Sequence, residues 1–163
     1  MMRVMLLRHE ISYAAPLADV FAMLSDPDFR QASATAMGVI SADVVITPND
    51  EGISVRIDQV QPTEGVPSFA KKFAGDSARA ITTQVWSGST ASYQVETPGK
   101  PTGIKGTASV TASGTGSVLL YDLEVKASVP LIGGKLEKLM VELTTEGFDK
   151  EQTVGAAWLA GER

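Results

Sequence analysis

The chain has 163 residues, a formal net charge of −5 and a pI of about 4.9. This length is that of one ordinary domain, so we predict a single domain over residues 1–163. The acidic balance argues against a nucleic-acid partner and against electrostatic adsorption to anionic lipid, because both favour a basic surface. Cysteine is absent and there is one histidine, which excludes thiolate and histidine-rich metal sites. We therefore expect neither a metal nor a cofactor.

The segment MMRVMLLRHE contains an apolar run, Val4 to Leu7, that is too short for the hydrophobic region of a signal peptide. Charged residues follow it directly. Further along the chain, no run approaches the length of a transmembrane helix. We therefore predict a cytoplasmic protein that is not stably inserted in a membrane.

Residues 3–14 are typical of a strand, because one face is mostly apolar and carries Met5, Leu7, His9, Ile11 and Tyr13. Pro16 suits the first turn of a helix. Apolar residues follow it at i, i+3, i+4 and i+7, namely Leu17, Val20, Phe21 and Leu24. Asp26 and Pro27 are a typical helix start, since aspartate caps helices and proline fits the first helical position. They predict a second short helix over residues 27–34.

Three hairpins are predicted next, and they pair residues 40–47 with 53–58, 79–86 with 91–97, and 104–112 with 118–129. The alternation of apolar and polar residues is typical of an antiparallel sheet with one covered face. In the second hairpin the inward face is ambiguous, because Gln84 and Trp86 compete with Thr83 and Val85. Residues 62–77 are too long for a simple hairpin turn, and we predict a helical turn over 68–73 within them.

A helical pattern runs from Ile132 almost to the C-terminus, and its apolar stripe consists of Ile132, Leu136, Leu139, Met140, Leu143, Val154 and Trp158. A helix of this size is roughly 40 Å long at 1.5 Å per residue, enough to cross a small domain. We predict that Leu136, Leu139, Met140 and Leu143 are buried against the sheet.

This order of elements, with two helices after the first strand and a long C-terminal helix, resembles the START-like superfamily (SRPBCC, helix-grip or birch-pollen-allergen-like proteins). The residues that carry the resemblance are HEISYAAPLADVFAMLSDPDFR, VPSFAKKFAGD and VKASVPLIGGKLEKLM. They look closest to an uncharacterised, DUF2505-like branch. The resemblance implies an α+β helix-grip fold, in which a curved antiparallel sheet of about six or seven strands wraps around the last helix.

The resemblance also implies that the usual activity is holding a hydrophobic small molecule or lipid. Some relatives are cyclases, some are Hsp90 co-chaperones and some transport lipids, so the fold alone does not determine the function. None of the matching segments is a catalytic motif.

Several residues are candidates for a cavity or its portal. His9 is the one side chain suited to acid–base work near neutral pH, but no partner stands out, and an ordinary core histidine is the alternative. Phe69 and Phe73 either form a lid, with Lys71 and Lys72 at its rim, or anchor a long loop. Gly147 either leaves room beneath the helix or marks a bend. The full predicted set is His9, Tyr13, Phe69, Phe73, Trp86, Tyr93, Leu136, Met140, Leu143 and Gly147.

The sequence therefore favours a module that binds a hydrophobic or amphipathic small molecule or lipid. Aromatic residues are just 6 % of the chain, and small residues at inward positions would leave volume, namely Ala42, Ala91, Gly106, Ala108, Ala112 and Ala127. One alternative is a cyclase- or hydrolase-type enzyme using the same cavity, for which the inward positions supply only His9 and tyrosines. Another is a protein-interaction module of the co-chaperone type. No catalytic residue is assigned.

Overall fold

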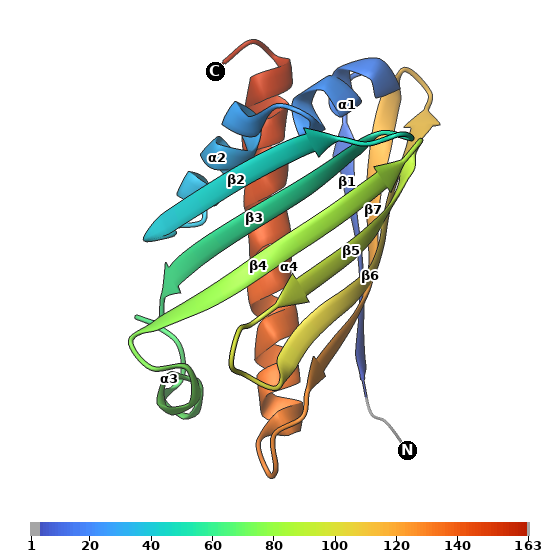
Figure 1. The fold of residues 1–163 in the computed structure, drawn as a ribbon. Helices are drawn as coiled ribbons and strands as arrows, with labels where there is room; N and C mark the ends of the chain where they lie inside the picture. Colours follow the sequence, from blue (N-terminus) through green and yellow to red (C-terminus); the bar gives the residue numbers. More distant parts are fainter. Residues whose placement is uncertain (1–3, 163) are drawn as a thin grey trace.

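A computed structural model describes residues 4–162, so Arg3 of the predicted first strand lies outside the described residues. The chain forms an α+β helix-grip fold, as predicted (Figure 1). In chain order the elements are β1 (Met5–Tyr13), α1 (Leu17–Leu24), α2 (Pro27–Ala36), β2 (Ser41–Pro48), β3 (Ile53–Pro62), α3 (Ser68–Ala74), β4 (Ser77–Ser87), β5 (Thr90–Glu96), β6 (Thr102–Ser113), β7 (Gly116–Ala127) and α4 (Gly133–Leu159).

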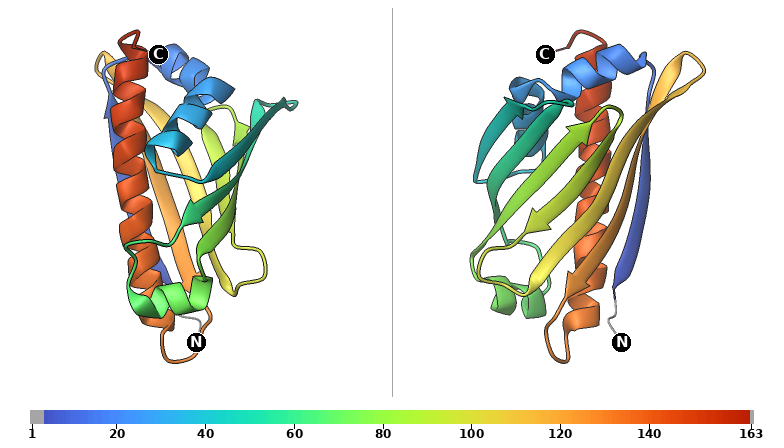
Figure 2. Two further views of the ribbon diagram at one scale, coloured as in Figure 1. Left: turned by 90° about the vertical axis from the view of Figure 1, so that its left-hand side faces the viewer. Right: turned by 45° about the vertical axis from the view of Figure 1, so that its right-hand side comes forward.

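The seven strands make one antiparallel sheet in the order β1-β7-β6-β5-β4-β3-β2. Strands β2 to β7 pair with their chain neighbours, and β1 pairs with β7, so Met5 lies opposite Val125. The sheet curves around α4 (Figures 1 and 2). At Gly106 of β6 a Cβ atom would lie 2.1 Å from the carbonyl oxygen of Asp122. This glycine therefore permits a close backbone approach, and it does not leave open volume as we had expected.

The two helices after β1 form for the reasons that the sequence suggested. Val20, Met23 and Leu24 bury the apolar stripe of α1. The Asp26 carboxylate accepts a hydrogen bond from the Asp28 backbone N–H at 2.9 Å and caps α2. Helix α2 continues two residues beyond the predicted end and packs against both α4 and β2.

Helix α4 is continuous over 27 residues and lies against β1, β7, α1 and α2. The turn before it places Leu131 in the left-handed region, with φ 70° and its side chain fully exposed. Figure 2 shows α2 beside one end of α4 and α3 beside the other. None of the helices between residues 4 and 162 combines the length and apolar character of a membrane span.

The predicted buried face of α4 was partly wrong. Leu136 is buried and Leu139 and Met140 are half-buried, but Leu143 is 44 % exposed. The buried residues of α4 are Gly133, Leu136, Glu137, Phe148, Glu151, Gly155 and Trp158. Two glutamates and two glycines lie on this face. A prediction from apolar residues alone therefore misplaces the buried face and includes Leu143.

Candidate functional site

Two neighbouring rows of inward side chains cross the concave face of the sheet. The first, which we call the closed row, consists of Val55, Gln84 and Tyr93 on β3, β4 and β5, and all three are buried, although their β2 neighbour Ile46 is half-buried at the sheet edge. The second, the open row, lies two residues along each strand and consists of Val44, Ile57, Thr82 and Val95. All four residues of the open row are half-buried. Solvent therefore reaches a largely apolar part of the concave face.

Aromatic rings fill the interior at the closed row. Phe148 of α4 stacks on Tyr121 with ring centroids 3.9 Å apart, and Tyr93 meets Tyr121 edge-on at 5.6 Å. His9 stacks on Phe148 at 5.5 Å. This cluster joins β1, β5, β7 and α4, and such contacts stabilise beyond the area that they bury.

The structure brings several of the predicted residues together in this interior. Tyr13, Trp86 and Tyr93 are buried, and His9 is half-buried beside them. The ambiguity in β4 is resolved, because Gln84 and Trp86 point inward whereas Val85 is exposed. Phe148 and Tyr121, which the sequence interpretation did not select, are the centre of the cluster.

His9 has no hydrogen-bond partner for its buried Nε2 atom among the described residues. The nearest acid is Asp149, whose Oδ1 atom lies 3.5 Å away on an exposed side chain. This separation allows an ion pair when the imidazole is protonated, but the geometry is not that of a hydrogen bond.

A buried carboxyl group, Glu151 of α4, lies next to the ring cluster. The Tyr121 hydroxyl donates to Glu151 Oε2 at 2.8 Å, and the Tyr13 hydroxyl donates to the Glu151 backbone carbonyl at 3.4 Å. Burial raises the pKa of Glu151 above its ordinary value of 4.5, while the charge of Arg30 and the Tyr121 hydrogen bond oppose this rise. Burial likewise raises the pKa of Tyr13, Tyr93 and Tyr121.

A buried guanidinium group, Arg30 of α2, lies on the other side of the closed row. Its Nε donates to the Leu24 carbonyl at 2.9 Å, and its Nη2 donates to Gln84 Oε1 at 3.1 Å. The same oxygen accepts a hydrogen bond from Trp86 Nε1 at 3.0 Å. Arg30 thus joins the end of α1 to the middle of β4.

Sequence reasoning missed Arg30, Gln84 and Glu151 as a group. A signal for Glu151 existed, because it lies three residues after Phe148 and seven before Trp158, on the buried face of α4. Arg30 follows Phe29 on a helix of low overall hydrophobicity, and no local pattern distinguishes it from a solvated arginine.

The half of α4 nearer its start carries the other predicted residues. Leu136 is buried in a second, smaller cluster with Ala70 and Ala127, and Met140 is half-buried between this cluster and the main core. At Gly147 a Cβ atom would lie 3.5 Å from Met37 Sδ, an ordinary contact. Leu143 points to solvent and does not line the interior.

Helix α3 closes the end of the molecule near the start of α4. Phe69 and Phe73 are half-buried against the smaller cluster. Lys71 and Lys72 are exposed. Lys100 donates to the Phe73 carbonyl at 2.9 Å, and its Nζ lies 5.1 Å from the centre of that ring. The aromatic pair therefore anchors α3 while lysines surround it.

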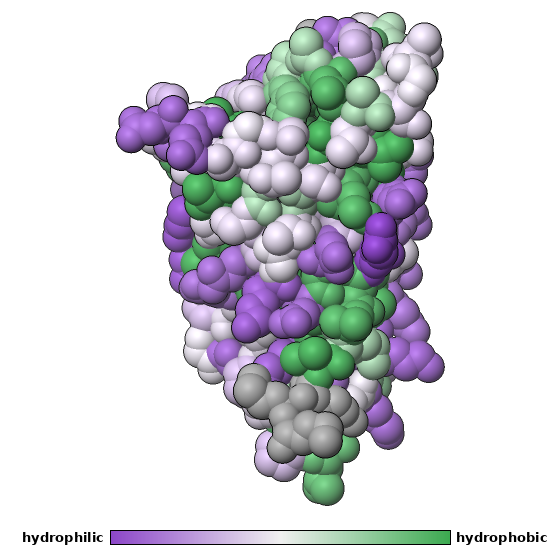
Figure 3. All heavy atoms as spheres, turned by 90° about the vertical axis from the view of Figure 1, so that its right-hand side faces the viewer, coloured by the Kyte–Doolittle hydropathy of each residue, from purple (hydrophilic) through white to green (hydrophobic). Residues whose placement is uncertain are grey.

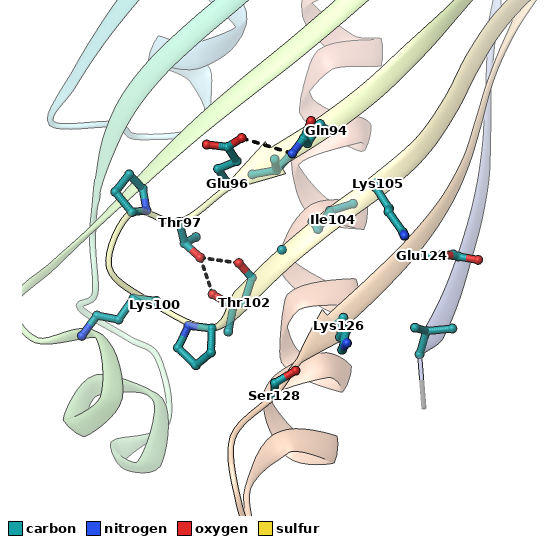
Figure 4. Close-up of a pocket in the computed structure, with 15 residues that line it drawn as sticks. Gln94, Glu96, Thr97, Lys100, Thr102, Ile104, Lys105, Glu124, Lys126 and Ser128 are labelled. Carbon is teal, nitrogen blue, oxygen red and sulfur yellow. Dashed lines mark hydrogen bonds between the residues drawn. The ribbon is translucent and has the colours of Figure 1, made fainter. Parts of the chain in front are cut away.

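Open depressions also exist on the convex face, and one of about 550 Å³ lies over β5, β6 and β7 (Figure 4). Its lining is rich in charged residues, and Lys105 lies opposite Glu124 in the strand register. On the neighbouring face apolar residues form a narrow band flanked by polar ones (Figure 3). These features are those of an ordinary solvated surface, so the concave interior is the better candidate.

Among residues 4–162 no three acidic or histidine side chains gather closely enough to hold a metal ion.

A family model described as a protein of unknown function, DUF2505, matches residues 8–159. The chain belongs to this family. A search of curated proteins finds no match to this DUF2505 chain. The resemblance inferred from the sequence is therefore confirmed at the level of the family.

Solved structures share the fold of this DUF2505 chain across its length. TTHA0849 from Thermus thermophilus is 19 % identical, with a TM-score of 0.68, and the match covers 96 % of this chain and 98 % of that one. Norcoclaurine synthase from Thalictrum flavum is 14 % identical, with a TM-score of 0.67 and coverage of 97 % and 87 %. A START superfamily protein from Mycobacterium smegmatis is 14 % identical, with a TM-score of 0.62 and coverage of 97 % and 99 %. At these identities the likeness concerns the fold alone.

Proposed function

We propose that this chain binds a hydrophobic or amphipathic small molecule or lipid, in the cytoplasm, along the open row. The observation that carries the proposal is the half-burial of Val44, Ile57, Thr82 and Val95 on the concave face. Protein interiors normally pack as densely as organic crystals. A half-buried apolar row between a curved sheet and a long helix therefore favours a partner that completes its burial.

The chemistry around the open row matches that of a ligand site. Such sites are mostly apolar with a few placed polar groups. Gln84 and Tyr93 lie one step from Thr82 and Val95 on the same strands, and Arg30 contacts Gln84. An amphipathic molecule would lay its apolar body on the open row and direct its polar end to these groups.

The direct test combines ligand discovery with a matched pair of variants. Native mass spectrometry of freshly purified protein should reveal a bound small molecule. A thermal-shift screen of fatty acids, isoprenoids and aromatic polyketides should raise Tm, because ligand at a hundredfold excess over Kd stabilises by about 2.7 kcal/mol. Failure of every compound class, with no co-purified molecule, would remove the proposal.

Thr82→Trp and Thr83→Trp form the matched pair, since the two threonines are neighbours on β4 and Thr83 faces the convex side. The tryptophan at 82 should fill the open row and abolish the ligand-induced shift. The tryptophan at 83 should leave it intact. Equal behaviour of the two variants would place the ligand elsewhere.

We further propose that the ligand enters beside α3, where Phe69 and Phe73 lie among exposed lysines. Lys71 and Lys72 would attract an acidic head group. The double variant K71A/K72A should slow association of a long-chain carboxylate in stopped-flow measurements at low salt. The K105A/K126A variant, which removes the same charge from the convex face, is the control. Equal rates in the two variants would contradict an entrance at α3.

A second candidate function is acid–base catalysis in the same interior. The observation that favours it is Glu151, a buried carboxyl group of raised pKa bonded to Tyr121. Once a ligand is known, prolonged incubation followed by mass spectrometry decides the question. Conversion that Glu151→Gln abolishes would establish an enzyme, and an unchanged ligand would leave binding alone.

A further inference from the structure

Arg30 carries a positive charge inside the protein without an acidic partner. The residue is 3 % exposed, and its two hydrogen bonds go to the neutral oxygens of Leu24 and Gln84. Within residues 4–162 it forms no ion pair, and its other N–H groups have no acceptor. A buried charge is costly unless it is paired and hydrogen-bonded. The site around Arg30 is therefore electrostatically incomplete.

Gln84 presents free donors next to this charge. Its oxygen accepts from both Arg30 and Trp86, which identifies the orientation of the amide group chemically. The amide nitrogen must then point away from both donors, and it has no acceptor among the described residues.

Two further hydroxyl groups in this region lack partners. Ser33 lies three residues after Arg30 on α2, is 5 % exposed, and its Oγ makes no hydrogen bond within the described part of the chain. Tyr93, the strand neighbour of Gln84, has ring contacts but no hydrogen bond from its hydroxyl among residues 4–162. Of these groups, only Ser33 Oγ is a fully buried atom without a partner among the described residues. The unpaired nitrogens of Arg30 and Gln84 and the Tyr93 hydroxyl are not fully buried, so an outside partner can reach them.

The nearby carboxyl group, Glu151, does not pair with these donors. Its two oxygens lie 3.2 and 2.8 Å from the Tyr121 hydroxyl, whose single proton they share. It forms no ion pair with Arg30. Burial raises the pKa of Glu151, and the charge of Arg30 opposes this rise without a direct contact between the two groups.

We propose that the ligand carries a carboxylate, and that this group binds against Arg30 and the amide nitrogen of Gln84 while the apolar body lies on the open row. The inference rests on the proposed function and adds the chemical class of the ligand. A carboxylate supplies two acceptor oxygens and one negative charge, which suits a guanidinium beside an amide. Gln84 and Thr82 stand about 7 Å apart on β4, so head and body fit adjacent rows.

The first test needs no variant. Decanoic acid, methyl decanoate and decanol have the same apolar chain, and their affinities are measured by calorimetry at pH 7. We expect the acid to bind more tightly than the ester and the alcohol by about tenfold or more, the scale of a hydrogen bond to a charged group. Equal affinities would overturn the carboxylate proposal but keep the proposed function. No binding by any of the three or by aromatic analogues (1-naphthoic acid, its methyl ester and 1-naphthylmethanol) would reject both.

The second test uses Gln84→Glu. Its carboxylate keeps an acceptor for Arg30 and Trp86 but removes the free amide donor and pairs the arginine internally. The acid preference should disappear, while methyl decanoate should bind as before. Gln94→Glu, on the outward face of β5, adds the same charge and should change nothing. A retained acid preference in a folded Gln84→Glu protein, or a crystal structure with water alone at Arg30 and the acid bound elsewhere, would also overturn the proposal.

Discussion

The closed row and the open row are one step apart on the same strands, yet the residues of the first are buried and those of the second are half-buried. The difference comes from the helices that face them. At the closed row, Phe148 of α4 packs against Tyr93 and Tyr121, and Arg30 of α2 donates to Gln84. Nearer its start, α4 carries the half-buried Met140 between the main core and the smaller cluster. On a sheet with regular strand pairing, the side chains of the facing helices determine which part of the concave face is packed core and which part is open to a ligand.

The largest effect should come from removing the central ring of the aromatic cluster at the closed row. Phe148→Ala removes the ring that links His9, Tyr93 and Tyr121, and should lower the free energy of unfolding by about 3–5 kcal/mol. Leu143→Ala, five residues earlier on the same helix, should stay within about 0.5 kcal/mol because that side chain is exposed. Urea denaturation measures both. Similar losses would mean that the two halves are equally packed.

Two glycines of α4 sharpen the comparison, because alanine should act on them with opposite signs. At Gly155 a Cβ atom would lie 2.5 Å from Tyr13 Oη, so Gly155→Ala should destabilise by about 1–3 kcal/mol through overpacking. At Gly147 the nearest atom is Met37 Sδ at 3.5 Å. Gly147→Ala should therefore gain up to about 1 kcal/mol from helix propensity. A loss at both positions would show that α4 is as tightly packed at Gly147 as it is at Gly155.

The smallest predicted effect is a change in the free energy of unfolding with pH. The pKa of Glu151 is higher in the folded state than its ordinary 4.5, so the folded protein holds this proton more tightly. Its contribution to stability is complete below pH 4.5 and is lost as the pH rises through the folded pKa, at up to about 1.4 kcal/mol per pH unit. Glu151→Gln should remove this slope, as seen in denaturation from about pH 4.5 to about pH 8. A variant with the same pH profile as the wild type would contradict a raised pKa of Glu151 in the folded state.

Much of the fold follows from local patterns. Alternation with period two located the hairpins, and Asp26 with Pro27 located α2, because these signals act within a few residues. The face of α4 did not follow as well, since Glu151 and Gly155 occupy buried positions there. Their partners, Tyr121 and Tyr13, are distant in sequence. Arg30 is the extreme case, because its hydrogen-bond partner Gln84 lies on a strand 54 residues later in the chain.

The residues of the candidate site likewise divide into those that local patterns predict and those that they do not. Tyr13 and Tyr93 were predictable as inward residues because each belongs to an alternating strand, whereas the alternation left the face of Trp86 ambiguous. Which of them contact solvent depends on the helices packed above them, and the sequence does not encode that locally. The roles of Phe69 and Phe73 as a lid and of Gly147 as ligand space remain predictions.

The pairing of β1 with β7 joins the beginning of the chain to a strand more than a hundred residues later, with Met5 opposite Val125. Contacts of such long sequence separation are costly in loop-closure entropy and tend to form late in folding. We expect the hairpins from β2 to β7 to assemble before β1 and α4 close over them. A hydrophobic molecule present during folding would then meet the open row before α4 covers it, whereas the folded protein takes it up through the entrance beside α3. Refolding with decanoic acid present should accordingly load the protein faster than adding the acid afterwards, and equal loading rates would show that entry into the native state is not limiting.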